Sequence, residues 1–476
     1  MIIPVLATVL ILAPLAWLWQ ASRLPHATSI MDMGYLDYGG AAPTGHDHAS
    51  GRPVTELIAD PARPAKVKID LVARQDPLSV GGQSIAGYTL NGTSPGPTIT
   101  ATQGDLVEVH VRNESVTAGI SLHWHGIDVP NAMDGVAGVT QDAVPAGGEF
   151  TYRFVAEQRG TYWYHSHQVS NEQVIGGLFG ALIVEPQKAE TSDVDVLAVA
   201  HLYGGIKTIN GLAEDYRVPA PPGSSVRVRV INTDKGPIEV WAGGPYRVLA
   251  VDGYEVNSPT EVSGESITLT AGGRVDLGIA MPADGSAMRV QVSKGTAVIL
   301  GEGEAPEPPQ PSRKVDLLSY GAPIAIGFDA QRPDRQFDYS IGRRPGFVKG
   351  KPGLWWTING HLYPNVPMYV VREGDVVRMR IDNHSGEVHP MHLHGHHAVV
   401  LARNGVAATG SPWWVDSLNV LDKETYEIAF LADNPGVWMD HCHNLQHAAD
   451  GMVAHLMYEG VTTPYVIGGS PDNQPE

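Results

Sequence analysis

The chain has 476 residues with 54 glycines, 36 prolines, a single cysteine and a formal net charge of -19. The acidic balance argues against nucleic acid as a partner, because nucleic-acid-binding proteins carry basic patches. One cysteine excludes an intrachain disulfide. The many glycines and prolines are typical of short strands joined by turns, and the length suits two or three domains.

The N-terminal stretch is strongly apolar. The first 19 residues carry no charge, and the first basic residue is Arg23. Such a run approaches the length that spans a bilayer, and it lacks the positive flank and the cleavage site of a signal peptide. We predict a signal or anchor helix over residues 1–22, with an uncleaved anchor favoured, and therefore an extracytoplasmic, membrane-anchored or secreted protein. Residues 23–64 are predicted to be a tether, whose soft or borderline metal ligands we interpret as incidental: Met31, Met33, His46 and His48.

A repeated unit begins beyond the tether. Val67, Ile69 and Leu71 alternate with polar residues, which indicates a half-buried strand. Longer copies of one pattern follow the Asn-Gly pairs at residues 91, 210 and 359, and the outer copies lead to His123 and His392. In the middle copy Trp241 or Ala242 takes the place of the histidine. Repetition on this scale predicts three related β domains, and alternating strands with Gly/Pro turns favour Greek-key sandwiches.

The domain limits follow from the repeats and from a proline-rich linker. We predict domain 1 over residues 65–187, domain 2 over 188–303, a semi-rigid linker over 304–314, and domain 3 over 315–465. Residues 192–300 hold one histidine, His201, and no ligand motif. Domain 2 is therefore predicted to be a spacer without metal ligands.

Histidines gather in four clusters near the ends of the outer domains. In each His-x-His pair the spacing places both imidazoles on one face of a strand. The fourth cluster also contains the only cysteine. The clusters are His123 and His125; His165 and His167; His389, His392 and His394; and His441, Cys442, His443 and His447, followed by Met452.

Cys442 is predicted to face away from the two histidines that flank it. One strand would then serve two metal sites back to back. His389, Cys442, His447 and Met452 form the His2Cys set with a weak axial methionine that is typical of blue copper. Eight histidines remain for a trinuclear cluster. The alternatives are core or surface histidines and a zinc site, although zinc rarely takes more than four ligands.

The motifs H-W-H-G, H-S-H, H-P-M-H-L-H-G-H and H-C-H-x3-H-x4-M resemble the four copper signatures of the multicopper oxidases, a family that includes laccases, bilirubin oxidases, cuprous oxidases and ferroxidases. The resemblance extends over about residues 65–462. It implies an all-β chain of three cupredoxin-like Greek-key β-barrel domains that binds four coppers, one of type 1, one of type 2 and two of type 3.

The resemblance also implies roles for individual residues. His123 and His392 correspond to the type 2 ligands. The type 3 ligands correspond to His125, His165 and His443 on one copper and His167, His394 and His441 on the other. Cys442, His441 and His443 would pass electrons from the type 1 copper to the cluster. The implied reaction couples one-electron oxidation of phenols, aromatic amines or metal ions to the four-electron reduction of dioxygen to water.

Several polar residues near the motifs are candidates for supporting roles. Asp134 matches an acid beside the cluster in similar bacterial enzymes and is a candidate proton relay; a turn-forming role is the alternative. Ala448 stands where some relatives have a glutamate, so Asp440 or Asp450 is a candidate substitute. His396 and His397 exceed the ligand count and are expected to be structural or to support the ligands. Glu387 and Asp416 are expected to orient imidazoles or simply to be solvated.

Three other functions compete with a laccase-like oxidase. The first is a metallo-oxidase for cuprous or ferrous ions in copper homeostasis, which the scattered distribution of the 12 methionines weakly disfavours. The second is a copper nitrite reductase, which would lack the full set of histidine motifs and the third domain. The third is a cupredoxin-fold scaffold without copper, which would have lost ligands. Three domains suggest a sufficient monomer.

Overall fold

The alternating pattern at residue 67 forms β4 (Val67–Arg74), which pairs in parallel with β9 (Leu106–Asn113). Leu71 and Ala73 of β4 are fully buried, as the alternation predicts. The computed structural model describes residues 2–43, 51–188 and 192–476. His46 and His48 of the predicted tether lie outside these residues.

The first domain is a sandwich of two four-stranded sheets around one apolar core. The order in one sheet is β10 (Leu122–His125), β12 (Gly160–Ser166), β13 (Phe179–Glu185) and β8 (Ile99–Thr102). The other sheet runs β11 (Glu149–Val155), β9, β4 and β7 (Thr89–Leu90), and the hairpin β5 (Leu78–Val80)–β6 (Gln83–Ile85) lies outside both.

The second domain has two six-stranded sheets around a separate core. One is ordered β15 (Ile206–Ile209), β14 (Val194–Tyr203), β17 (Ser225–Asn232), β22 (Arg274–Ala280), β19 (Arg247–Val251) and β20 (Tyr254–Glu255). The other is ordered β16 (Tyr216–Val218), β24 (Ala297–Leu300), β23 (Met288–Val292), β18 (Ile238–Ala242), β21 (Glu265–Leu269) and β25 (Arg313–Lys314).

The third domain contains the largest core cluster. Its first sheet is ordered β2 (Tyr35–Asp37), β28 (Pro367–Val371), β37 (Val453–Tyr458), β36 (Val437–Cys442), β30 (His389–Leu393) and β34 (Ser417–Val420). Its second sheet is ordered β27 (Lys351–Ile358), β26 (Arg335–Val348), β29 (Val376–Asn383), β35 (Thr425–Leu431), β31 (Ala398–Arg403) and β32 (Val406–Ala407), with β33 (Trp414–Val415) also on β31. The prediction of an all-β chain built from three cupredoxin-like Greek-key barrels is confirmed.

The internal repeat extends to the pairing of single residues. In domain 1, His123 lies opposite His165 and Leu122 opposite Ser166. In domain 3, His392 lies opposite His441 and Met391 opposite Cys442. The same strand pair thus presents histidines at one end of both outer domains. In domain 2 the corresponding strand β18 places Trp241 opposite Gln291.

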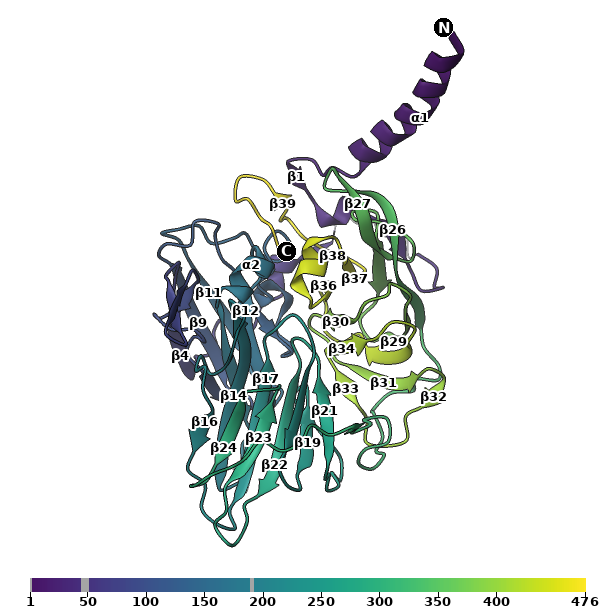
Figure 1. The fold of residues 1–476 in the computed structure, drawn as a ribbon. Coiled ribbons are helices and arrows are strands. Elements are labelled where there is room, and N and C mark those ends of the chain that lie inside the picture. The colour runs from purple at the N-terminus through teal and green to yellow at the C-terminus, as the bar shows by residue number, and fades with distance from the viewer. Residues whose placement is uncertain (1, 44–50, 189–191) are drawn as a thin grey trace.

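The N-terminal segment packs largely on domain 3. Helix α1 (Ile2–Ala21) projects from the body near β26 and β27 (Figure 1). In the part of the chain that the structure describes, no helix meets the length and hydropathy needed to cross a membrane. Short strands attach the predicted tether to the body: β1 (Ala27–Thr28) pairs with β39 (Ile467–Gly468), β2 with β28, and β3 (Arg52–Pro53) with β38 (Val461–Thr462). Met33 is buried in the core of domain 3.

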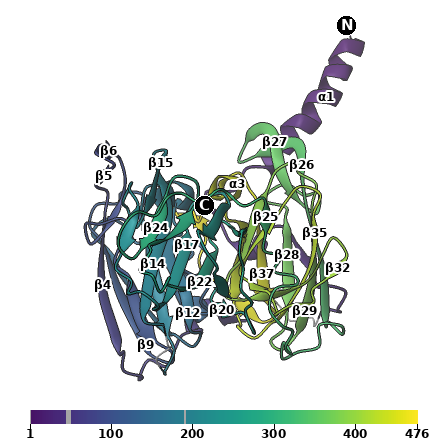
Figure 2. The ribbon, with the colours of Figure 1, turned by 60° about the horizontal axis from the view of Figure 1, so that its bottom comes forward.

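Domains 1 and 2 lie side by side, and domain 3 lies across from them (Figures 1 and 2). An apolar cluster joins β12 and β13 of domain 1 to β14 and β17 of domain 2 and includes Leu445 of domain 3. Leu445 belongs to helix α3 (Leu445–Ala449), which packs near helix α2 (Ser170–Ile175) of domain 1. The histidine-bearing ends of domains 1 and 3 therefore face each other.

Candidate metal centres

Eight buried imidazoles from β10, β12, β30, β36 and the residues that follow these strands meet between domains 1 and 3. The Nε2 atoms of His123 and His392 lie 3.3 Å apart across the domain boundary. Those of His394 and His441 lie 3.1 Å apart. The eight are the predicted cluster residues: His123, His125, His165, His167, His392, His394, His441 and His443.

Each of the two histidine sets that correspond to type 3 ligands lies close together within the cluster. Ring centroids of His125, His165 and His443 lie 4.8 to 5.7 Å apart. Those of His167, His394 and His441 lie 5.0 to 5.2 Å apart. His123 and His392 stack on these sets, because the ring centroids of His123 and His394 and those of His125 and His392 lie 3.7 Å apart.

Hydrogen bonds hold one nitrogen of most of these rings. His123 Nδ1 and His394 Nδ1 each donate to the Asp134 carboxylate at 3.0 Å. His392 Nδ1 donates to the Asp416 carbonyl oxygen at 2.9 Å, and His125 Nε2 donates to Asp416 Oδ1 at 3.0 Å. These bonds fix each ring and leave its other nitrogen directed at the cluster.

Five of the other ring nitrogens have no hydrogen-bond partner among the described residues. This holds for His125 Nδ1, His165 Nε2, His167 Nε2 and both nitrogens of His443. A buried polar atom without a partner is costly, so several of them within one cluster point to a bound partner. Unprotonated imidazole nitrogens suit copper, and the arrangement therefore fits a metal cluster.

Burial keeps the rings in the form that binds a metal. Desolvation lowers the pKa of His125, His165 and His167 well below the usual value near 6.5. It does the same to the pKa of His394, His441 and His443. The imidazoles are therefore neutral at ordinary pH and keep a lone pair for a cation.

A second, smaller site lies on the opposite face of β36. His389 Nδ1 and His447 Nδ1 lie 3.6 and 3.7 Å from Cys442 Sγ and 3.2 Å from each other. Met452 is fully buried, and its carbonyl oxygen accepts a hydrogen bond from Cys442 N at 3.1 Å. The second nitrogen of His389 is bonded to the Ser385 hydroxyl at 2.7 Å.

The protonation state of the buried Cys442 thiol depends on a nearby positive charge. Burial raises its pKa above the ordinary value, so the thiolate forms only beside a compensating positive charge such as a metal ion. Cys442 is also the residue between His441 and His443, one from each predicted set. The two sites are thus joined through adjacent residues of one strand.

The structure places the other predicted residues as follows. Glu387 Oε2 lies 3.5 Å from His447 Nε2. His397 contacts Asp416 at 3.2 Å, and His396 Nε2 is bonded to the Tyr458 hydroxyl at 2.6 Å. Asp440 is buried, which raises its pKa to about 8. Asp450 accepts a hydrogen bond from Gln446 at 3.2 Å. Only Asp134 and Asp416, among the predicted acids, contact cluster histidines.

Sequence reasoning missed three residues beside the cluster. Glu476 Oε1 lies 3.2 Å from His441 Nδ1, and Pro475 O accepts from His167 Nδ1 at 2.9 Å. Arg274 of domain 2 donates to both carboxylate oxygens of Asp416 at 2.6 and 2.7 Å. None of the three lies near a histidine motif, so spacing offered no signal for them.

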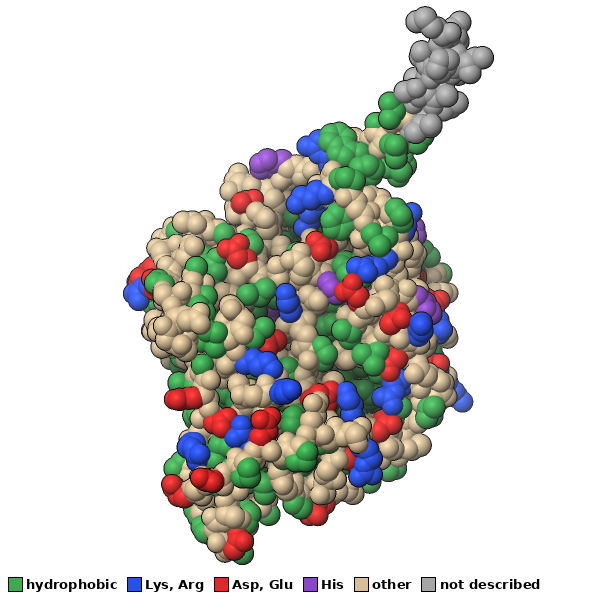
Figure 3. Space-filling view, viewed as in Figure 1, with side chains coloured by type: hydrophobic (Ala, Val, Ile, Leu, Met, Phe, Trp, Pro, Cys, Tyr) green, Lys and Arg blue, Asp and Glu red, His purple; other side chains and the backbone are tan. Residues whose placement is uncertain are grey.

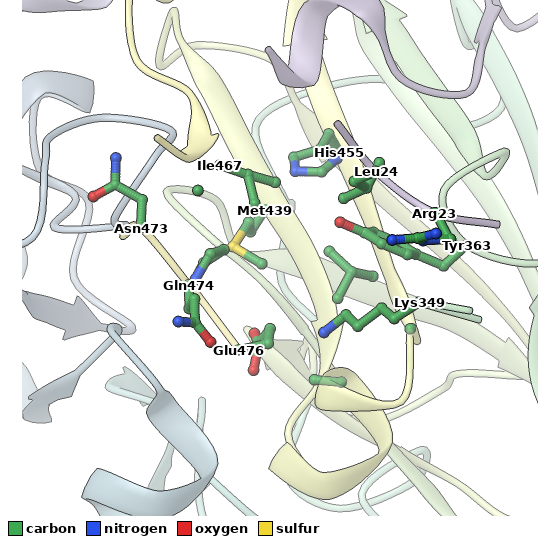
Figure 4. Close-up of a pocket in the computed structure, with 15 residues that line it drawn as sticks. Arg23, Leu24, Lys349, Tyr363, Met439, His455, Ile467, Asn473, Gln474 and Glu476 are labelled. Carbon is green, nitrogen blue, oxygen red and sulfur yellow. The ribbon is translucent and has the colours of Figure 1, made fainter. Parts of the chain in front are cut away.

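A cavity of about 290 Å³ reaches the cluster through Glu476 and Pro475, which contact His441 and His167 (Figure 4). Glu476, Met439 and His455 line it, together with Tyr363 and Lys349. Burial raises the pKa of Glu476 to about 8, and Ser170 Oγ donates to its Oε2 at 2.8 Å.

Few histidines appear on the molecular face in Figure 3, where acidic and basic side chains are interspersed.

The chain is similar to known copper proteins. Two family models, each described as multicopper oxidase, match residues 73–189 and 330–460. The multicopper oxidase MmcO of Mycobacterium tuberculosis is 30% identical over 86% of this chain and 88% of its own. Laccase-1 of Botryotinia fuckeliana is 28% identical over 81% of each. The crystal structure of a multi-copper oxidase from Pseudomonas thermotolerans matches with a TM-score of 0.69 and 25% identity, over 83% of this chain and all of that one.

Proposed function

The chain belongs to the multicopper oxidase family, and from that premise we propose which residues hold copper and which reductant the enzyme oxidises. As a member of the family it is an oxidoreductase that takes electrons from a reducing substrate and passes them to dioxygen. The observation that carries the proposal is the cluster of eight buried imidazoles beside the Cys442 site, in which three histidine triads have nitrogens within 4.8 Å of one another and five ring nitrogens have no hydrogen-bond partner among the described residues.

We assign four coppers per chain. His389, Cys442, His447 and Met452 hold the type 1 copper, and His123 and His392 hold the type 2 copper. One type 3 copper takes His125, His165 and His443, and the other takes His167, His394 and His441. Copper supplies reversible one-electron chemistry at the first site and the binding and four-electron reduction of dioxygen at the other three.

The protein's own groups prepare these sites. Asp134 and Asp416 lock the tautomers of four ligands by accepting their ring N–H groups. Burial excludes water and keeps the rings neutral. The main chain from His441 through Cys442 to His443 provides a covalent path between the sites.

For the substrate we favour a phenol or an aromatic amine. Glu387 is the acid nearest His447, and Arg343 pairs with it at 3.0 Å. The Arg343 guanidinium also lies over the Trp356 ring, 4.0 Å from its centroid. The carboxylate that would attract a cuprous or ferrous ion is therefore already neutralised, which disfavours the metallo-oxidase alternative.

A substrate comparison tests this choice. Steady-state dioxygen consumption by the copper-loaded chain would be measured with phenols, aromatic amines, Cu(I) and Fe(II). We expect the highest kcat/KM with an organic reductant. An Arg343→Gln variant frees Glu387 and should shift the preference toward the cations. Faster turnover of Cu(I) or Fe(II) by the parent chain would overturn the choice.

Copper analysis separates the oxidase from a scaffold protein. An oxidase of this kind carries four coppers and shows the strong visible absorption of a Cu(II)–thiolate centre. A scaffold would bind little copper.

We further propose that the protein is monomeric and extracytoplasmic, secreted or held at a membrane by residues 1–22. Sedimentation and fractionation of cells that express the full chain test these two points.

A further inference from the structure

Arg274 is the first residue of β22, in the domain that has no predicted copper ligand. Its side chain is 0% exposed and is bonded to all three domains. Its Nε donates to the Thr161 carbonyl oxygen of domain 1 at 3.0 Å. Its Nη1 lies 3.5 Å from Asp252 of domain 2. Its two terminal nitrogens donate hydrogen bonds to the two carboxylate oxygens of Asp416 of domain 3.

Asp416 in turn accepts hydrogen bonds from two predicted ligands on different domains. Its carboxylate accepts from His125 Nε2 of domain 1, and its carbonyl accepts from His392 Nδ1 of domain 3. The rings of His125 and His392 stack at 3.7 Å with an interplanar angle of 9°. A carboxylate held at both oxygens by a planar guanidinium has little freedom to rotate. The position of Arg274 therefore sets the orientation of both rings.

The turn before Arg274 approaches the cluster directly. Gly272 has φ +78, and a Cβ there would lie 2.7 Å from His125 Cε1 and 3.0 Å from His443 Cδ2. Its carbonyl oxygen accepts a hydrogen bond from the Trp163 indole at 3.1 Å. The β21–β22 turn of domain 2 thus forms part of the wall around the imidazoles.

We propose that Arg274 is a positioning residue for the copper cluster, which acts through Asp416 on His125 and His392. The domain predicted as a spacer then contributes structure to a metal site whose ligands all belong to the other two domains. This inference rests on the proposed assignment of His125 and His392 as copper ligands.

A matched pair of arginine variants tests the proposal. Arg335 is 1% exposed and is also held between two carboxylates, those of Asp375 and Glu459 at 2.6 and 3.0 Å. It contacts no predicted ligand in the described structure. Arg274→Lys and Arg335→Lys both keep the buried charge and both lose the planar fork, so they differ mainly in proximity to the cluster.

The readout is copper retention and spectroscopy. Loss of a group that supports a metal ligand typically weakens metal binding about 10- to 100-fold. We expect Arg274→Lys to lose cluster copper to a competing chelator about tenfold more readily than the parent. Its type 2 electron paramagnetic resonance signal should change, and its blue absorption should persist. Arg335→Lys should match the parent in all three measurements.

Equal copper retention and identical resonance signals in the two variants would overturn the proposal and leave Arg274 as an ordinary buried ion pair. If the Arg274 variant does not fold, Asp252→Asn replaces it, because this change weakens the support of Arg274 from its other side. In the described structure Asp252 contacts no predicted ligand side chain, although its Oδ2 also accepts from the backbone N–H groups of Asp416 and Ser417 at 3.4 Å. The same criteria then apply. A parent chain that binds no copper would instead refute the proposed function, so the two failures are distinguishable.

Discussion

At the scale of single residues, the hydrogen bond on one nitrogen of an imidazole decides what the other can do. A ring whose N–H is held by a carboxylate presents a lone pair in a fixed direction. Asp134 does this for His123 of domain 1 and His394 of domain 3, both predicted ligands, at once. The site is therefore prepared by residues that do not bind metal.

Cys442→Ser should abolish the blue absorption and substrate oxidation and leave three coppers per chain. A hydroxyl is a poor substitute for a soft thiolate, and the cluster ligands on either side point the other way. Domain 1 already has a serine, Ser166, at the position equivalent to Cys442. The hydroxyl of Ser166 donates a hydrogen bond to Gln173 at 2.6 Å. Metal analysis and visible spectroscopy check this. Substrate turnover at the parental rate would contradict the electron path through Cys442.

Asp134→Asn should weaken the cluster. The two ring N–H groups that meet the carboxylate need two acceptors, and an amide offers one oxygen and a competing N–H. We expect copper binding to weaken about tenfold and reoxidation of the reduced cluster by dioxygen to slow. Chelator competition and stopped-flow reoxidation would be measured, with Asp450→Asn as the matched control. Parental values in both would leave Asp134 as a turn residue.

At the scale of elements, two turns bring supporting groups to the histidine cluster. The turn after residue 133 brings Asp134 back to β10, and the turn before β22 brings Gly272 against two imidazoles. Both approaches rely on glycines with positive φ, where a side chain would collide with the strand or with a ligand.

Gly135→Ala should destabilise the fold by more than a typical loop glycine does. Gly135 has φ +78, and a Cβ there would lie 1.8 Å from the Leu122 carbonyl oxygen. Gly147 is the control, because it has φ +83 and open space around its Cβ. The backbone strain alone costs about 1–3 kcal/mol. Denaturant unfolding of the copper-free variants should show a larger loss for Gly135→Ala; equal losses would contradict the packing argument.

Much of the site was predictable because its ligands repeat along the chain. The His-x-His spacing on strands places pairs of rings on one face, and the back-to-back position of Cys442 follows from strand alternation. Arg274, Asp252 and Glu476 were not predictable, since each is a single residue far in sequence from any motif. Only the packing of domains and the C-terminal segment brings them to the cluster.

At the scale of the whole molecule, the cluster forms where domains 1 and 3 meet. Domain 2 contacts both of these domains beside the cluster. Its own core and the shared apolar cluster with domain 1 make it a structural partner of the site. Stability of domain 2 should therefore matter for metal binding.

Acid should destabilise the copper-free chain, in part through His201 of domain 2. Burial lowers the pKa of His201 to about 4 from an ordinary value of 6.5. The unfolded chain takes up this proton first, so stability is lost as pH falls from about 6.5 to 4, by on the order of 3 kcal/mol for this group. His201→Gln should flatten the decline in melting temperature over that range. An unchanged pH profile would contradict the buried, neutral histidine.

The central claim is that electrons collected singly at the Cys442 site reduce dioxygen fully at the cluster. The most direct test is to count, in one sealed vessel, the molecules of a one-electron reductant oxidised per dioxygen consumed, with peroxide measured at the end. The account predicts four per dioxygen and no peroxide. A ratio of two with accumulation of hydrogen peroxide would contradict it.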